Sequence, residues 1–190
     1  ADEQLQRAMG KAKIGFVGKR KKAVDALPEF EDLRSSARAI KDHTLEHLDL
    51  YLEAYERKVI ASGGQVHWAE TAEDARQAVL GICRAAGART VTKGKSMITE
   101  EIALNDFLEK EGVRPVETDL GEYIIQLRGE HPSHIIGPAL HLNKEQVEED
   151  FRRVHTELPA GRDLSQPESL LGEARHILRP QYFQADVGIT

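Results

Sequence analysis

Apolar residues recur at steps of three and four positions from Pro28 to Val59, which is the period of one helical face. The residues on this stripe are Phe30, Leu33, Ala37, Ile40, Leu48, Tyr51, Leu52, Tyr55 and Val59. Proline is tolerated in the first turn of a helix, and Gly63-Gly64 is a typical stop signal. A straight helix of this length would reach roughly 50 Å. We therefore predict a kink or a split into two helices.

Residues 1–25 have a weaker pattern. It predicts a short helix from Glu3 to about Ala12, followed by a polar connector that contains the basic run Lys19-Arg20-Lys21-Lys22. A short charge run is typical of a solvated linker, and contact with an anionic partner is the alternative. Together with the long helix, these residues form a predicted helical extension over positions 1–62.

From position 63 onward, strand-like and helix-like segments alternate. The predicted elements are a strand at Val66–Trp68, a helix capped by Thr71 and ended by Gly87, a strand at Thr90–Thr92, a helix from Thr99 to Glu111, a strand at Arg114–Thr118, a helix capped by Asn143 that runs to about His155, a helix from Glu168 to Arg179 that Pro180 ends or bends, and a strand that begins within Ala185–Thr190. Such alternation predicts an α/β fold with a mostly parallel sheet that is flanked by helices.

Lys93-Gly94-Lys95-Ser96 lies between a predicted strand and a predicted helix. Backbone N–H groups at a helix start favour anions, and lysines strengthen that preference. We therefore expect Lys93, Lys95 and Ser96 to bind a substrate or another anion, with two solvated turn lysines as the alternative. A nucleotide-binding phosphate loop is excluded, because Arg89 stands where that motif requires glycine.

Three further residues are candidates for catalytic proton transfer. Glu117 and Asp119 lie at the carboxyl end of a predicted strand, where ligands of open α/β sheets bind. For Asp119, capping of the next helix is an equally good interpretation. His134 follows in a short apolar element, and imidazole titrates near neutral pH. A structural, hydrogen-bonded histidine is the alternative for that residue.

Composition excludes several kinds of protein. The chain has 190 residues and a net charge of −6, which argues against a dedicated nucleic-acid binder. Its single cysteine, Cys83, cannot form an internal disulfide or, alone, a cysteine-based metal site, and its place on an apolar helix face predicts burial. His43 and His47 are four apart, but Thr44 replaces the glutamate of the metalloprotease motif, so no metal site is expected. No apolar run approaches the ~20 residues of a membrane span and no signal peptide is evident, so we expect a cytoplasmic protein.

Four stretches carry a family resemblance. They are Thr92–Glu101 with its K-x-K-S-M-x-x-E-E pattern, Glu117–Leu127, Pro132–Ala139 and Ala185–Thr190. In this order they resemble the lactate-utilization B family of iron–sulfur proteins, which have a LUD-type domain. The resemblance implies a fold like that of sugar isomerases and coenzyme-A transferases. It also implies a subunit of a complex that oxidises L-lactate to pyruvate, with other lactate-utilization subunits as partners and a small carboxylate or other anion as ligand.

The chain departs from this family at its end. The family continues past the D-V-G-I-T strand into a glycine- and asparagine-containing turn and an A-E-T-G segment. Farther on it has a ferredoxin-like region with two cysteine clusters. We therefore expect residues 63–190 to be an incomplete LUD-type domain in an N-terminal fragment, with 4Fe-4S clusters in the missing region and no cofactor on these residues. Two alternatives remain open: a standalone isomerase- or transferase-like enzyme acting on a small anionic substrate, and a non-catalytic assembly module that docks partners through the N-terminal helices.

Overall fold

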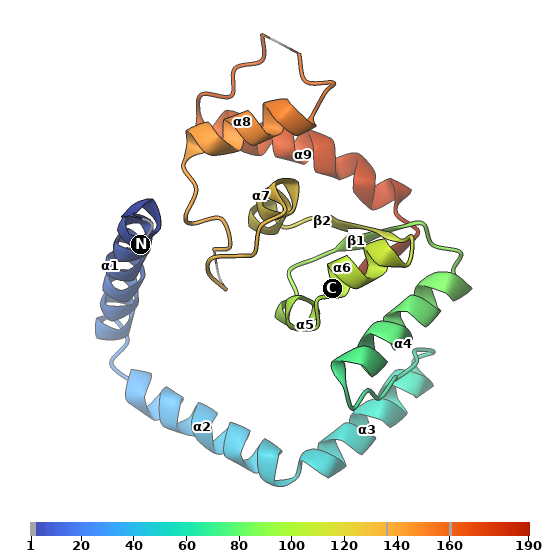
Figure 1. The fold of residues 1–190 in the computed structure, drawn as a ribbon. Helices are drawn as coiled ribbons and strands as arrows, with labels where there is room; N and C mark the ends of the chain where they lie inside the picture. The colour runs from blue at the N-terminus through green and yellow to red at the C-terminus, as the bar shows by residue number, and fades with distance from the viewer. Residues whose placement is uncertain (1–2, 136, 160) are drawn as a thin grey trace. The chain divides into compact units, whose positions relative to one another are not determined.

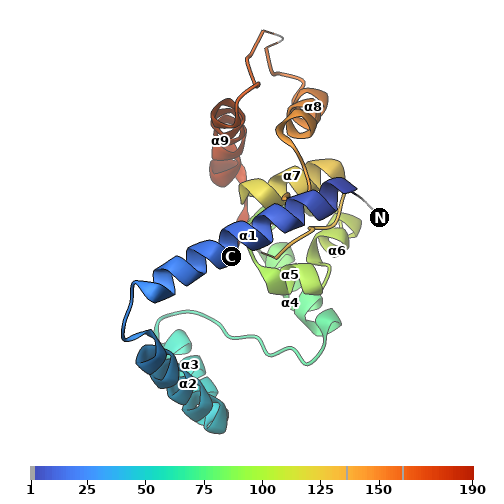
Figure 2. The ribbon, with the colours of Figure 1, turned by 90° about the vertical axis from the view of Figure 1, so that its left-hand side faces the viewer.

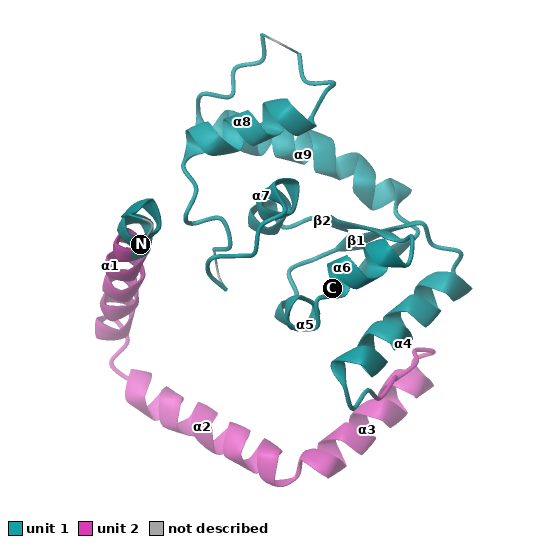
Figure 3. Cartoon of the chain, in the orientation of Figure 1, with its two compact units in different colours: residues 1–9, 69–190 teal, residues 10–68 magenta. Residues whose placement is uncertain are grey.

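The computed structural model describes residues 3–135, 137–159 and 161–190. Its elements are α1 (Glu3–Asp25), α2 (Phe30–Glu46), α3 (Leu48–Ala61), α4 (Ala72–Ala85), β1 (Thr90–Lys93), α5 (Met97–Glu101), α6 (Leu104–Lys110), β2 (Arg114–Glu117), α7 (Leu120–Arg128), α8 (Lys144–Val154), α9 (Pro167–Gln184) and β3 (Val187–Ile189). They divide into two compact units (Figure 3). We call residues 1–9 and 69–190 the sheet unit, and residues 10–68 the helical unit. The domain boundary expected between residues 62 and 63 stays a prediction.

In the helical unit, the long apolar stripe divides into α2 and α3 at His47, as the predicted split requires. The basic connector predicted after Ala12 is wrong, because α1 continues to Asp25. Lysine and arginine are good helix formers, and Lys21 pairs with Asp25 one turn later at 2.9 Å.

The strand predicted at Val66–Trp68 is also absent. This segment has no regular structure, and none of the described strands pairs with it. Trp68 is 60% exposed, and its indole N–H donates to Glu56 Oε1 over 3.1 Å. Without a neighbouring strand its backbone groups have no ladder to join, so the apolar pattern alone does not make it a strand.

The sheet unit contains a parallel sheet with strand order β2-β1-β3, which confirms the predicted α/β class. In register, Val91 lies beside Pro115 and Val187, and Lys93 lies beside Glu117. Helices α4, α5 and α6 lie on one side of the sheet, and α7, α8 and α9 on the other (Figures 1 and 2). Both faces are thus covered, as parallel sheets require.

The core of the sheet unit has one part on each face. On the first face, Val91 packs with Leu80 and Cys83 of α4 and with Leu104 and Leu108 of α6. Cys83 is 0% exposed, which confirms the expected buried position. On the second face, Val116 packs with Tyr123 and Leu178, and a further cluster joins α7, α8 and α9 around Phe151.

Side chains cap helices and the edge of the sheet where the backbone lacks partners. Thr71 and Asn143 form capping boxes at α4 and α8, and Asp119 caps α7, all at the predicted positions. The edge strand β2 is protected by the amide of Gln126, which accepts from Glu117 N and donates to Pro115 O over 3.0 and 2.9 Å. No described helix is both long and apolar enough to cross a membrane.

Candidate functional site

The carboxyl ends of β1 and β2 bring Lys93 and Glu117 together. Lys93 Nζ lies 2.7 Å from Glu117 Oε1 and 2.5 Å from Glu100 Oε1 on α5. It also donates to Thr99 Oγ1 over 3.0 Å. The lysine is only 1% exposed, so its positive charge is removed from water and must be compensated inside the protein. Two carboxylates provide that compensation.

Glu117 is 2% exposed and uses its two oxygens unequally. Oε1 forms the ion pair with Lys93 and also accepts a hydrogen bond from the side-chain amide of Asn105 over 2.7 Å. Oε2 has no hydrogen-bond partner in the described part of the chain. Burial raises the pKa of Glu117 above its ordinary value, against the lowering effect of Lys93 and Asn105. A buried carboxyl with a raised pKa is a typical group for proton handling.

Lys95 forms a second, more exposed cluster at the start of α7. Its Nζ lies 3.1 Å from Glu122 Oε1 and 3.5 Å from Asp119 Oδ1, and its side chain is 34% exposed. Burial alone would lower the pKa of Lys95, but the bond to Glu122 and the charge of Asp119 outweigh it and raise the pKa. Asp119 Oδ1 also accepts from the backbone N–H groups of Gly121 and Glu122, so its capping role is real.

The other two predicted residues have local contacts. Ser96 is the N-cap residue of α5, but its hydroxyl makes no capping hydrogen bond. Its backbone carbonyl accepts a hydrogen bond from Thr99 Oγ1 over 2.8 Å. His134 lies in the loop between α7 and α8, where its Nδ1 accepts from Gly137 N over 3.3 Å. This loop adjoins the α7 start, because a Cβ on Gly121 would lie 2.8 Å from Pro138 Cγ.

The charges of the two lysine clusters do not form a simple anion site. Together they hold two ammonium groups and the four carboxylates of Glu100, Glu117, Asp119 and Glu122. An incoming anion would therefore compete with carboxylates that already occupy the lysines. Of the predicted anion-binding residues, Lys95 has the more accessible charge and Lys93 is enclosed. Anion binding by Lys93, Lys95 and Ser96 stays a prediction, as does proton transfer by Glu117, Asp119 and His134.

A cavity of about 310 Å³ opens beside Glu117. It is lined by Thr99, Glu100, Ala103, Leu104, Asn105, Asp106, Glu109, Glu117, Glu122, Ile125, Gln126, Gly129, Glu130 and His131. No sequence pattern marks Glu100 or Asn105 as site residues. The signal available for Glu100 was its place in the Glu100-Glu101 pair after the two lysines, but nothing in the sequence shows that it meets Lys93.

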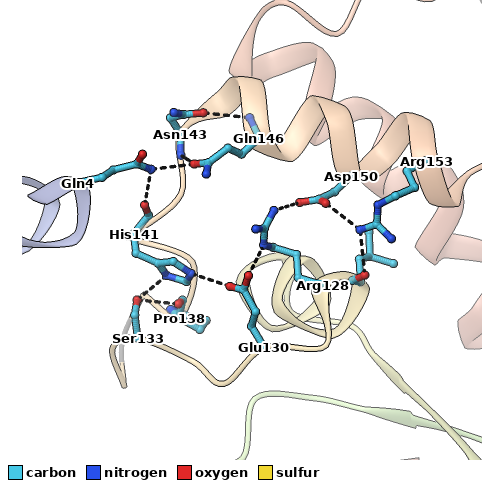
Figure 4. A network of polar contacts seen from close by, with 11 residues as sticks. Gln4, Arg128, Glu130, Ser133, Pro138, His141, Asn143, Gln146, Asp150 and Arg153 are labelled. Carbon is cyan, nitrogen blue, oxygen red and sulfur yellow. Dashed lines mark hydrogen bonds and ion pairs between the residues drawn. The ribbon is translucent and has the colours of Figure 1, made fainter. Parts of the chain in front are cut away.

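A polar network joins Glu130, which lines the cavity, to α8 and to the loop that precedes it (Figure 4). Glu130 accepts from Arg128 and contacts His141 Nε2 at 3.0 Å, and Arg128 also pairs with Asp150 of α8 at 2.7 Å. The hydrogen bond with His141 and the charge of Arg128 lower the pKa of Glu130, despite a smaller opposing effect of burial.

The same network fixes the loop between α7 and α8. Ser133 Oγ donates to Pro138 O, so its lone pair must accept from His141 Nδ1, 2.8 Å away. Gln4 of α1 joins this network by donating to His141 O and to Gln146 Oε1 (Figure 4).

An iron–sulfur cluster does not fit the described residues. Cys83 is the one cysteine of the sequence, and its side chain packs in the apolar core against α6. No group of three or more histidine, cysteine, aspartate or glutamate side chains within the described ranges is placed to hold a metal ion. Any cluster of this protein would need ligands from outside residues 1–190.

Comparison with known proteins gives relatives along the whole chain. Lactate utilization protein B of Bacillus velezensis is 42% identical over 190 residues, and that of Bacillus subtilis is 41% identical over 194 residues. The electron transport protein YkgF of Escherichia coli, itself uncharacterized, is 39% identical over 189 residues. Each alignment covers 100% of this chain but only 39% of the relative.

No solved structure gave a significant match. The sequence profile of the LUD domain matches residues 52–190, which is well over half of the chain and contains both lysine clusters and the cavity. The chain therefore belongs to the LUD domain family and is homologous to the N-terminal 39% of lactate utilization protein B.

Proposed function

We propose that this protein is an iron–sulfur subunit of a cytoplasmic complex that oxidises L-lactate to pyruvate, with its 4Fe-4S clusters held outside residues 1–190. The observation that carries the proposal is the identity of about 40%, along the whole chain, to proteins named for lactate utilization. A relative named as an electron transport protein supports the redox part. Since the chain spans 39% of these relatives, ample sequence outside it could hold the clusters.

Within that complex, Lys95 is our candidate for holding the carboxylate of a small acid. Its charge is partly accessible, and it sits where β1 ends. A ligand carboxylate would take the place of the 3.5 Å contact with Asp119, the weaker of the two ion pairs of Lys95. Glu117 would act as the proton-handling group, because burial has raised its pKa.

The test uses the complete natural protein, purified anaerobically with its partner subunits. We expect bound iron and lactate-dependent reduction of an added electron acceptor. A natural protein without iron, or one that leaves lactate unoxidised in its assembled complex, would contradict the proposal.

Replacement of Lys95 tests the ligand role separately. A charge-assisted hydrogen bond contributes about 1.5–3 kcal/mol, so Lys95→Met should raise the KM for lactate roughly tenfold or more. The matched control is Lys110→Met, an exposed lysine at the end of α6 that should leave the KM unchanged. Equal KM values in both variants would show that Lys95 does not bind lactate. They would not affect the separate test of bound iron.

A specific observation also favours an assembly role. None of the residues 10–68 is buried, although the unit contains large apolar side chains such as Ile14, Ile40, Leu45 and Tyr55. We propose that this helical unit docks partner subunits. Changing Ile40 and Leu45 to serine should release the partners in size-exclusion chromatography of the complex, whereas Ser35 and Ser36 changed to alanine should not.

A further inference from the structure

Helix α1 concentrates positive charge, although the chain as a whole is acidic. Residues 10–24 contain six lysine and arginine residues and no aspartate or glutamate, whereas the whole chain has a net charge of −6. The six basic residues are exposed, and they are Lys11, Lys13, Lys19, Arg20, Lys21 and Lys22. Among the ion pairs of the described residues, that of Lys21 with Asp25 is the one formed by this helix. Most of its positive charge therefore has no carboxylate partner in the described part of the chain.

Two exposed apolar side chains lie in the middle of this charge. Ile14 and Val17 are 78% and 61% exposed. They are three positions apart in a helix, so they lie next to each other on one face. The helical period of roughly 3.6 residues places basic residues along both sides of this pair, with Lys13 and Arg20 on one side and Lys11 and Lys22 on the other. We call these six residues the basic face of α1.

The helix has little support from the rest of its own unit. None of the residues 10–25 is buried, and Gly10, Gly15 and Gly18 fall within the helix. Glycine disfavours helices, and a Cβ added at any of these three positions would meet nothing within 4 Å, so close packing inside the described chain does not require them. Such a helix gains stability when its apolar side chains pack on another surface.

The pattern of the basic face selects among possible partners. Nucleic-acid phosphates match its charge but offer nothing to Ile14 and Val17. A protein groove that binds a helix uses apolar anchors that continue over two turns, and the next position on this stripe is Lys21. An anionic lipid surface accepts both features. Its headgroups attract lysine and arginine, and the boundary with the acyl chains takes up apolar side chains without a fixed pattern of anchors.

We propose that the basic face of α1 attaches this protein to the surface of an anionic lipid membrane. Ile14 and Val17 enter the boundary between headgroups and acyl chains, while the flanking lysines extend their ammonium groups to the lipid phosphates. The helix lies on the membrane, since no described helix is long and apolar enough to cross it. It precedes residues 52–190, which match the LUD domain, and the attachment does not rest on the proposed lactate function.

The experiment measures how much of the complete natural protein, assembled with its partner subunits, sediments with lipid vesicles. The vesicles contain equal parts of phosphatidylglycerol and phosphatidylcholine. We expect binding that weakens as the salt concentration rises, and little binding to vesicles of phosphatidylcholine alone.

A triple variant tests the charge of the basic face. Lys11→Gln, Lys13→Gln and Lys22→Gln together should weaken vesicle binding about a hundredfold, because each basic residue near the lipid contributes a factor of about five. The matched control is Lys41→Gln, Lys58→Gln and Lys110→Gln, which removes the same charge from exposed positions outside α1 and should leave binding nearly unchanged.

A double variant tests the apolar pair. Ile14→Ser with Val17→Ser keeps every charge and should weaken vesicle binding at least about tenfold, because neither side chain is then taken out of water. Leu50→Ser with Ile60→Ser changes two exposed apolar residues of α3 and should leave vesicle binding unchanged. None of these four residues is buried, so the core of the sheet unit is intact in both variants.

Four results would overturn the proposal. The first is equal binding to anionic and neutral vesicles, and the second is an equal loss in the two lysine variants. The third is full binding by the Ile14/Val17 variant together with tight binding of the protein to double-stranded DNA, which would identify a nucleic-acid partner. The fourth is vesicle binding by the isolated subunit but not by the assembled complex, which would show that a partner subunit covers the basic face.

Discussion

At the scale of single residues, the buried charge of Lys93 determines how the charged side chains of the site are paired. Its ammonium group is enclosed by Glu100, Glu117 and Thr99. The positive charge that the sequence suggested for ligand binding is therefore paired with two carboxylates inside the fold. A buried ion pair does not add much stability as a whole, because desolvation offsets the attraction. Removing one member, however, leaves the other charge without compensation.

We therefore expect Lys93→Met to destabilise the protein by about 3–5 kcal/mol. The measurement is urea unfolding of the natural protein, followed by circular dichroism. Lys144→Met, which removes a half-exposed lysine whose pair with Glu145 spans 3.8 Å, should cost less than about 1 kcal/mol. Lys93→Met with Glu117→Gln should recover part of the loss. Equal costs for Lys93→Met and Lys144→Met would show that the buried pair is not needed.

Asp186 gives a pH dependence with a definite sign. Backbone N–H bonds from Arg89 and Thr90 lower the pKa of its carboxyl in the folded state. A group with a lowered folded pKa stabilises the fold above its unfolded pKa, and this contribution is lost as the pH falls through the lower folded value. Asp186→Asn should therefore destabilise the protein near neutral pH, and the difference from wild type should vanish in acid.

Thermal unfolding of both proteins across the acid range measures this effect. Asp163→Asn is a useful comparison, because the pKa of Asp163 is also lowered, but by Ser165 in the same loop. That local bond does not join distant segments, so its loss should change the melting temperature less. A pH-independent difference between wild type and Asp186→Asn would contradict the argument.

At the scale of elements, the break between α5 and α6 shapes the site. Ala103 adopts the left-handed conformation with φ of 49°, which alanine tolerates poorly. The periodicity of residues 99–111 predicted one helix and gave no sign of this break. Because of it, α6 starts in a new direction and places Leu104 in the core and Asn105 against Glu117. The strained residue thus lies in the wall of the cavity.

Ala103→Gly should stabilise the protein by up to about 1 kcal/mol, because glycine adopts positive φ without a Cβ clash. The same replacement at Ala78, in the middle of α4, should instead cost roughly 1 kcal/mol through lost helix propensity. The denaturant midpoint should rise relative to wild type for Ala103→Gly and fall for Ala78→Gly. Destabilisation by both replacements would mean that Ala103 has an ordinary helical backbone.

At the scale of the whole molecule, the two units differ in how they are stabilised. The sheet unit has apolar clusters on both faces of its sheet. The helical unit has helices but no buried residue. Most helical stability in proteins comes from packing of an apolar face, so these helices depend on further contacts.

A peptide of residues 10–68 should accordingly be mostly unfolded in water at 25 °C. Circular dichroism at 222 nm measures its helix content, and titration with the purified partner subunits should increase it. The control peptide carries the Ile40→Ser and Leu45→Ser changes and should gain little. A fully helical, cooperatively melting peptide in the absence of partners would contradict this expectation.

Local patterns in the sequence were enough to predict a large part of the fold. The division of the long stripe, the caps at Thr71, Asp119 and Asn143, and the burial of Cys83 follow from interactions within one or two helical turns. Alternation of strands and helices gave the parallel α/β class, and short motifs gave the LUD family. Where local signals were weak the predictions failed, as in the basic connector that is part of α1 and the missing strand at Val66–Trp68.

The site itself was decided by the tertiary structure. The sequence named Lys93, Lys95 and Glu117 as separate candidates, but it could not show that the first and third neutralise each other. Lys95 meets Glu122 from 27 positions away, and Asp186 reaches Arg89 from 97 positions away. Such contacts depend on strand register and on how deeply each charge is buried, and no pattern of neighbouring residues encodes either. The sequence alone therefore determined most of the elements and the family. The packing of β1, β2, α6 and α7 decided which charges are compensated and which acceptors lack a partner in the described part of the chain.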